Sequence, residues 1–350
     1  MQDSLFSRHA ASADWPRTLR ELSDAGVTRS QVAGRSWRRT SYGRHAPAGG
    51  AQTARTQKTS AQSTTQRIID ALASVPKGGA LGGWAAAFVH GVDWLDGWSL
   101  AGDALPVPVV CGTHVHRRST STIRYRRDRL DPLEVEERHQ LPVTCGLRTA
   151  FDAARWAPDL TETVVVLDAI TRTGLVTLAD LGDYLTRRSG WTGVPLVRSA
   201  LALADADVRS PWESRLRMVY TMEAGLPRPL VNPPVYDDRG RFVGVPDLLD
   251  VEAGLAIEYD GSGHRERVQH NQDNGREERL EDVNLIVVRV DSYDYRYQRP
   301  QLIERMRKAR ARGLHRDRRR DRWTLETPQW AQNPYDLLTD EDKEALYGRH

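Results

Sequence analysis

The chain has 350 residues, of which 39% are hydrophobic and 28% charged, and its formal net charge is +3. This length exceeds one typical core, so we expect two or three domains, and the stock of apolar residues excludes a chain that is disordered throughout. Cys111 and Cys145 have neither metal-site nor disulfide spacing, and no apolar run approaches the roughly 18 residues of a membrane span. We therefore expect a cytoplasmic protein with no membrane partner.

Residues 1–45 predict a winged helix-turn-helix. Apolar positions recur at helical spacing from Trp15 to Gly26, and Thr28 stands where it can cap a second short helix. The next segment alternates aromatic and small residues with arginines, as two strands beside a phosphate backbone would. The alternative is a solvated helix pair that only covers the next domain. The arginines expected to contact DNA are Arg29, Arg35, Arg38, Arg39 and Arg44.

Two further segments precede the most informative region. Residues 46–65 are rich in Ala, Gly, Ser, Thr and Gln without periodicity, which predicts a linker. Residues 66–206 alternate helical and extended patterns and predict a mixed α/β middle domain without catalytic spacing. Its expected helices are 67–74, 84–90, 147–156, 160–171 and 178–187, and its expected strands are 107–111, 122–125 and 141–144.

Residues 207–300 predict the order helix, three strands, helix and strand. Ser210 begins the first helix as its cap, and an apolar stripe follows at Leu216, Val219 and Met222. Turn residues then separate three extended runs, and an almost wholly apolar run has the character of a buried strand. The three strands are expected at 230–236, 241–250 and 255–260, the second helix at about 271–282 and the last strand at 285–290.

Three carboxylates fall where this order can bring them together. Asp247 lies on the second predicted strand, while Glu258 and Asp260 share one face of the third, two residues apart. Adjacent antiparallel strands bring such side chains close, and a hard divalent cation relieves their repulsion. We expect Mg²⁺ or Mn²⁺ here, which lowers the pKa of a bound water and stabilises the leaving oxygen of a phosphodiester. Alternatively, each acid only ends a strand or caps a turn.

Two groups of segments resemble known families. SPWESRLR, RFVGVPDLLDVEAGLAIEYDGSGH and QDNGREERLEDVNLIVVRV resemble the very-short-patch-repair endonuclease domain of the restriction-endonuclease-like superfamily. GVTRSQVAGRSWRR resembles the winged helix of abortive-infection type IV antitoxins, and LPVTCGLRTAFDAAR resembles a segment that follows it there. The resemblance implies a multidomain α+β or α/β protein with an N-terminal winged helix and a C-terminal αβββαβ nuclease core.

The resemblance also implies roles for individual residues. The catalytic positions of the family fall on Glu213, Asp247, Glu258, Asp260 and His264, with metal binding by Asp247 and its neighbours. His264 would transfer protons or contact phosphate, and Arg276 is a candidate phosphate contact. Where many superfamily members carry lysine, this chain has Asp260. The residues that could supply the missing cation are His264, Arg265 and Arg267.

The sequence therefore predicts a DNA-binding, metal-dependent phosphodiester hydrolase of the endonuclease type, acting in phage defence or DNA repair. Nucleic acid, with a toxin or another defence protein, would be its partner. The alternative is an antitoxin-like transcriptional regulator or DNA-binding protein whose nuclease fold is inactive, which the missing lysine favours and the retained acids oppose. Residues 301–350 predict a basic helix and tail that either hold a polyanion or only aid solubility.

Overall fold

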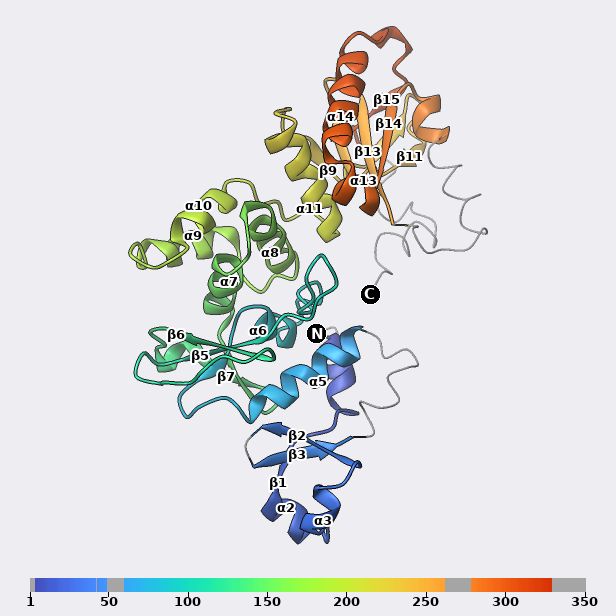
Figure 1. The fold of residues 1–350 in the computed structure, drawn as a ribbon. Coiled ribbons are helices and arrows are strands. Elements are labelled where there is room, and N and C mark those ends of the chain that lie inside the picture. The colour runs from blue at the N-terminus through green and yellow to red at the C-terminus, as the bar shows by residue number, and fades with distance from the viewer. Residues whose placement is uncertain (1–3, 42, 49–59, 262–277, 329–350) are drawn as a thin grey trace. The chain divides into compact units, whose positions relative to one another are not determined.

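The computed structural model describes residues 4–41, 43–48, 60–261 and 278–328. The chain divides into two compact units, residues 1–204 (the N-terminal unit) and 205–350 (the C-terminal unit). Each unit combines helices with sheets, so the protein is α+β with several sheets (Figure 1). Within the described ranges, no helix has both the length and the apolar character needed to cross a bilayer.

Two capped helices and a small antiparallel sheet follow the first helix, α1 (Leu5–Ala10). Thr28 caps α3 (Arg29–Val32) in a capping box with Gln31, as predicted, and Thr18 caps α2 (Leu19–Asp24) in the same way. The helix expected from Trp15 therefore begins later, because the residues before Leu19 form strand β1. The sheet has the order β1 (Arg17–Thr18), β3 (Arg44–Pro47) and β2 (Trp37–Ser41).

The predicted linker is shorter than 46–65. Strand β3 includes Ala46 and Pro47, and helix α5 (Ser60–Leu72) begins well before residue 67. Thr64, Thr65 and Ile68 of α5 are fully buried, and α5 contacts strands on both sides, β2 and β5. The composition of this segment does not reveal that its small polar residues are buried in a helix.

The rest of the N-terminal unit is a five-stranded sheet with helices. The sequence patterns do not predict three of its elements, β4, β7 and α10. Strand β4 is very short and β7 is polar, while α10 follows Gly193, whose backbone is left-handed with φ 86°. The strand order is β6 (Ile123–Arg127), β5 (Val107–Cys111), β4 (Ala80–Leu81), β8 (Leu141–Thr144) and β7 (Val135–Arg138). The helices are α6 (Gly83–Val89), α7 (Gly146–Arg155), α8 (Leu160–Arg172), α9 (Leu178–Thr186) and α10 (Val194–Leu201).

A buried ionic cluster joins α7 to the sheet. Arg148 is fully buried, and its Nε lies 2.8 Å from Asp152 Oδ2 while its Nη1 lies 2.8 Å from Glu134 Oε2. Arg155 Nε donates to the second oxygen of Asp152 at 2.8 Å. Burial raises the pKa of Asp152, and the two arginines partly offset this increase. The cluster therefore depends on its members compensating one another's charge.

The C-terminal unit contains two sheets where the sequence predicted one meander. Pro233, Pro234 and Pro246 interrupt the expected runs 230–236 and 241–250, because proline cannot donate to a strand ladder. The four-stranded sheet has the order β14 (Ile286–Asp291), β13 (Leu255–Asp260), β12 (Leu248–Asp250) and β9 (Leu230–Val231). The three-stranded sheet has the order β11 (Phe242–Gly244), β10 (Val235–Asp237) and β15 (Trp323–Thr324).

Helix α11 (Pro211–Met218) begins at Ser210, as predicted, but it changes to a π-helix over Val219–Glu223. The Ala224 N–H donates to the Val219 carbonyl, a five-residue step that a regular α-helix does not make. Leu216 and Val219 are fully buried, whereas Met222 is 52% exposed. The wider turn thus moves Met222 off the predicted apolar stripe.

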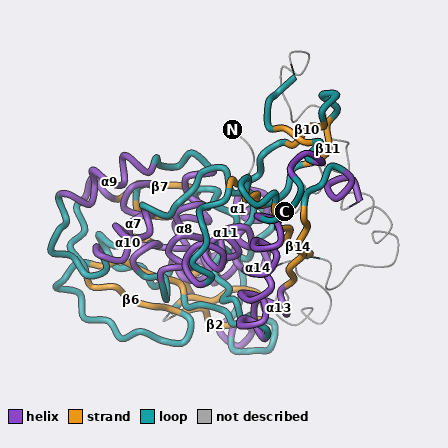
Figure 2. Tube along the Cα trace, turned by 90° about the horizontal axis from the view of Figure 1, so that it is seen from above, coloured by secondary structure: helices purple, strands orange, loops and turns teal. Residues whose placement is uncertain are grey.

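The basic helix is part of the same unit. Helices α13 (Ser292–Tyr297) and α14 (Arg299–Leu314) follow β14, and both views draw α14 alongside that strand (Figures 1 and 2). Leu302, Met306 and Ala309 of α14 are buried. Several basic side chains hold the fold: Arg307 donates to the Ala224 carbonyl, and Arg316 pairs with Asp321. Much of the predicted basic surface is therefore structural.

Asp250 gives a test of this packing. Burial alone would raise its pKa, but hydrogen bonds from Tyr220, the Ala253 N–H and Arg310 together lower it. We expect Asp250→Asn to lower the unfolding free energy by about 2–3 kcal/mol at pH 7. Because the folded pKa lies below the unfolded value of about 3.9, this difference is full above that value and is lost as pH falls through the folded pKa. Urea unfolding from pH 7 to 3 measures it, and a difference independent of pH would contradict it.

Candidate active site

The three predicted metal-binding acids lie on one face of the four-stranded sheet. Leu248 pairs with Ile257 at the end of the antiparallel ladder of β12 and β13, and extension of this register by one residue places Asp247, which directly precedes β12, opposite Glu258. Directly opposite residues point to the same face, with Cβ atoms about 4.5–5.5 Å apart. Asp260 follows Glu258 by two residues and shares its face. We name this side the acid face, defined by Asp247, Glu258 and Asp260.

Hydrogen bonds fix Asp247 directly before β12. The Tyr259 N–H donates to its Oδ2 at 2.7 Å, and its carbonyl accepts from the Asn232 N–H at 3.0 Å. The carboxylate is thus held against β13 beside Glu258, which is only 8% exposed. Asp247 and Asp260 are half-buried, so solvent reaches the acid face.

An apolar cluster lies next to the acid face on the same side of the sheet. Leu249 and Ala256 point to the same side as the acids and pack with Leu280 and Val283, which belong to and follow a helix over residues 278–282. This packing covers the first half of β13, and the carboxylates occupy its second half. The transition from apolar to acidic side chains along one strand therefore marks the edge of the core.

Strand β14 adds two charged residues that the sequence reasoning missed. It runs parallel to β13, with Arg289 beside Glu258 and Asp291 beside Asp260. Laterally paired residues share a face, so one cation and a further acid lie next to the acid face. The available signal was the single arginine within the apolar run IVVRV. Strand β14 therefore places one guanidinium and one further carboxylate in register with the acids of β13.

Glu213 has a different environment from the other acids. It is 5% exposed, and its Oε2 accepts from the Arg209 N–H at 2.8 Å and from Asn232 Nδ2 at 2.6 Å. Burial raises its pKa, which these hydrogen bonds partly offset. The bond from Asn232 therefore fixes the start of α11 to the turn after β9, while the bond from Arg209 stays within the segment that leads into the helix.

Asn232 connects Glu213 to the acid face and was also missed. It is 2% exposed and left-handed, with φ 48°, a conformation that asparagine tolerates better than most residues. Its backbone N–H binds the Asp247 carbonyl while its side chain binds Glu213. The sequence signal is an asparagine directly before Pro233 and Pro234. Asn232 is a positioning residue for both carboxylates.

Aromatic packing holds α11 on the opposite face of the sheet. The Tyr259 ring stacks on Trp212 with centroids 4.6 Å apart and planes 11° apart, and Tyr295 meets Trp212 edge-on. Tyr259 alternates with Glu258 and Asp260 along β13, so this stack lies behind the acids. The stack therefore supports the strand from behind without filling the acid face.

The remaining predicted residues of the site lie outside the described residues. His264, Arg265, Arg267 and Arg276 all fall in 262–277. In the described part of the chain, no three His, Cys, Asp or Glu side chains gather as a metal centre. The acid face there is a cross-strand pair of carboxylates with a third acid two residues along one strand.

The predicted DNA-binding arginines of the N-terminal unit divide by environment. Arg38 is half-buried and forms a bidentate ion pair with Asp70 of α5. Its Nη1 lies 2.5 Å from Oδ2 and its Nη2 lies 2.9 Å from Oδ1. Arg44 Nη1 donates to the Pro16 carbonyl at 3.4 Å, and Arg39 Nε donates to the Ser41 carbonyl at 3.1 Å. Arg38 therefore has a structural role in the N-terminal unit. The exposed members of the predicted set are Arg29, Arg35 and Arg39.

Comparison with known proteins assigns no relative to this chain: no protein-family model, curated protein or solved structure matches it.

Proposed function

We propose that the chain is a DNA-binding phosphodiester hydrolase of the endonuclease type, dependent on Mg²⁺ or Mn²⁺, with the acid face as its active site. The observation that carries the proposal is the hydrogen bond from the Tyr259 N–H to Asp247, which holds this carboxylate against β13 next to Glu258, in line with the register of β12 and β13 extended by one residue. Within the four-stranded sheet, the order of helix α11, strands β9, β12 and β13, the helix at 278–282 and strand β14 supports a restriction-endonuclease-like αβββαβ core, with β10 and β11 inserted as part of the second sheet.

The residues of the acid face fit a magnesium ion. Proteins usually bind Mg²⁺ through one or two carboxylates, while waters and substrate phosphates take the other positions. Asp247 and Glu258 would hold the ion, with Asp260 next on the same face. The ion supplies a bound water of lowered pKa and a positive charge for the leaving oxygen. Asn232 and the Tyr259 N–H keep Asp247 in place for this role.

The N-terminal unit would contact DNA. Helices α2 and α3 with strands β1 to β3 have the element order of a winged helix, and Arg29 and Arg35 are exposed on it. With the sequence resemblance, this supports a cytoplasmic protein of phage defence or DNA repair, with a toxin or another defence protein as a partner.

A second candidate function is DNA binding without cleavage, as in an antitoxin-like transcriptional regulator. Two observations favour it. Asp260 stands where the superfamily carries lysine, and one oxygen of Asp247 already accepts a backbone hydrogen bond. Both functions use the same DNA-binding surfaces, so only cleavage separates them.

Incubation with end-labelled DNA separates these two functions. We expect the purified protein to cut single-stranded, duplex or mismatched DNA with Mg²⁺ or Mn²⁺ and to leave all of them intact in EDTA. Intact DNA under every metal condition, with retention of DNA on the protein, would establish the second function instead. Absence of both cleavage and retention would contradict both functions.

Arg289 gives a sharper prediction for the site. A cation beside Glu258 can stabilise charge that develops on the scissile phosphate, so Arg289→Ala should slow cleavage by about 10² to 10³-fold and Arg289→Lys much less. DNA affinity in EDTA and thermal unfolding should stay the same. Arg239→Ala, in an exposed turn, is the matched control. Wild-type rates for Arg289→Ala would show that the paired cation has no part in the reaction.

A further inference from the structure

Two tyrosines on α13 expose their rings to solvent. Tyr293 and Tyr297 are 56% and 71% exposed, and their ring centroids lie 5.2 Å apart with a tilt of 47°. A pair of neighbouring exposed aromatic rings is informative because soluble proteins bury most such surface. Helix α13 begins directly after Asp291, which is paired with Asp260 of the acid face. Both rings therefore belong to the short helix that directly follows the strand of Asp291.

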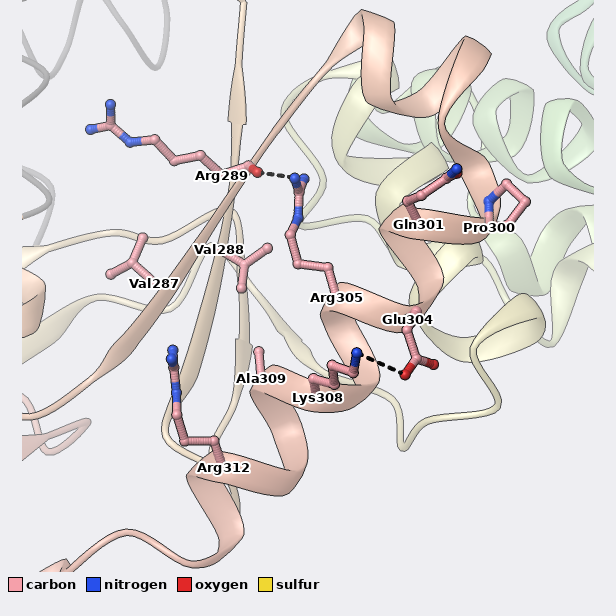
Figure 3. A pocket seen from close by; sticks show the side chains of 10 residues that line it. All are labelled: Val287, Val288, Arg289, Pro300, Gln301, Glu304, Arg305, Lys308, Ala309 and Arg312. Atoms are coloured by element: carbon pink, nitrogen blue, oxygen red, sulfur yellow. Dashed lines mark hydrogen bonds and ion pairs between the residues drawn. The ribbon is translucent and has the colours of Figure 1, made fainter.

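A basic groove adjoins the same elements. It has a volume of about 840 Å³ and lies between strand β14 and helix α14 (Figure 3). Its floor is apolar and includes Val288 and Ala309, while one side of α14 contributes Arg305, Lys308 and Arg312. These three cations recur at helical spacing beside the buried stripe of the helix. In Figure 3 Arg305 reaches toward β14, and Lys308 pairs at 3.4 Å with Glu304, the one acid among the lining residues.

An ion pair links the groove to the tyrosine helix. Arg305 reaches Asp294 Oδ2 at 2.5 Å and donates to the Arg289 carbonyl at 2.9 Å. Asp294 follows Tyr293 on α13 and lies one turn before Tyr297. Arg305 is thus fixed between the two features. Arg289 itself points away from α14 in Figure 3, consistent with its place beside Glu258.

We propose that α13 and the groove form one binding surface for single-stranded nucleic acid, in which unpaired bases stack on Tyr293 and Tyr297. The phosphate backbone lies along Arg305, Lys308 and Arg312. This inference rests on the proposed function and specifies its substrate as a single strand or an unpaired end.

The combination of rings and cations selects this ligand. Base faces are available for stacking only where the bases are unpaired, and aromatic side chains beside a basic channel are the usual elements of single-strand binding. A DNA duplex would contact the cations but has no free base faces to stack on the rings. The carboxylates of an acidic peptide would also pair with the cations alone. The groove borders β14, whose Arg289 points to the other side of that strand, beside Glu258.

Fluorescence anisotropy in EDTA tests the surface without cleavage, using a labelled 20-nucleotide thymidine strand and a 20-base-pair duplex. Tyr293→Ala with Tyr297→Ala should weaken single-strand binding about tenfold or more and duplex binding less than about twofold. The paired Tyr→Phe variant should bind like wild type, because stacking needs the ring and not the hydroxyl. Met222→Ala, another exposed apolar side chain of this unit, is the control.

The cations are tested by salt dependence. Lys308→Ala with Arg312→Ala should lower the slope of log K against log salt by about 0.7 for each phosphate that is no longer neutralised, whereas Arg319→Ala with Arg320→Ala should not. Wild-type binding by the double Tyr→Ala variant, or equal weakening for both DNAs, would overturn the proposal. Equal competition by a polyglutamate peptide of matched charge would also overturn it. Cleavage plays no part in these outcomes, so failure of the nuclease proposal remains distinguishable.

Discussion

Replacing Asp247 by asparagine is expected to slow Mg²⁺-dependent DNA cleavage by about two to three orders of magnitude, as loss of several kcal/mol of transition-state stabilisation implies. Asparagine has nearly the same size and keeps an oxygen to accept the Tyr259 N–H, so the backbone at β12 and β13 should be retained. It removes the negative charge that a divalent cation needs. Single-turnover cleavage measured on denaturing gels gives the rate directly.

The matched control for this substitution is Asp238→Asn, which changes the same charge in an exposed turn of the same unit. It should cleave at the wild-type rate, and both variants should bind DNA in EDTA as the wild type does. Thermal unfolding of both variants should also agree with that of the wild type. An Asp247→Asn protein that cleaves as fast as its control would remove Asp247 from the active site.

Replacing Arg148 by methionine should lower the free energy of unfolding of the N-terminal unit by about 3 kcal/mol or more. Methionine fills much of the same volume but leaves Asp152 and Glu134 buried with less compensation. Arg155 still binds Asp152, so the destabilisation stays short of that from an isolated buried charge. Hydrogen exchange of peptides from α7, measured by mass spectrometry, reports the change locally.

Arg138→Met is the control for Arg148→Met. Arg138 pairs with Glu136, but both side chains are more than a third exposed, so the pair should contribute less than about 1 kcal/mol. Urea unfolding of the two variants compares a buried ion pair with an exposed one on adjoining elements. Equal unfolding free energies for the two variants would contradict the structural role of the buried cluster.

The sequence predicts the local features of the fold well. The bounds of β13, residues 255–260, agree with the structure because the run LAIEYD lies between two glycines, Gly254 and Gly261. The caps Thr28 and Ser210 agree because capping depends on residues three apart. The division of the two predicted strands 230–236 and 241–250 is harder to predict. Prolines 233, 234 and 246 indicate that these strands are interrupted, but tertiary packing decides which sheet each part joins.

The candidate site is predictable to the same extent. The period of two residues along a strand places Glu258 and Asp260 on one face, and a meander brings Asp247 near them. The position of Arg289 beside Glu258 depends on β14 pairing parallel to β13, a contact that no local pattern specifies. Arg38 shows the same limit, because its ion pair with Asp70 joins β2 to α5, a tertiary contact that no local pattern specifies.

A crystal structure of the protein soaked with Mn²⁺ tests the central claim most directly, since the anomalous signal of manganese locates the ion. The account predicts one ion with oxygens of both Asp247 and Glu258 within about 2.0–2.6 Å of it, and no such peak in Asp247→Asn. A soaked crystal with no ion at the acid face, or with its ion bound elsewhere on the chain, would contradict the account.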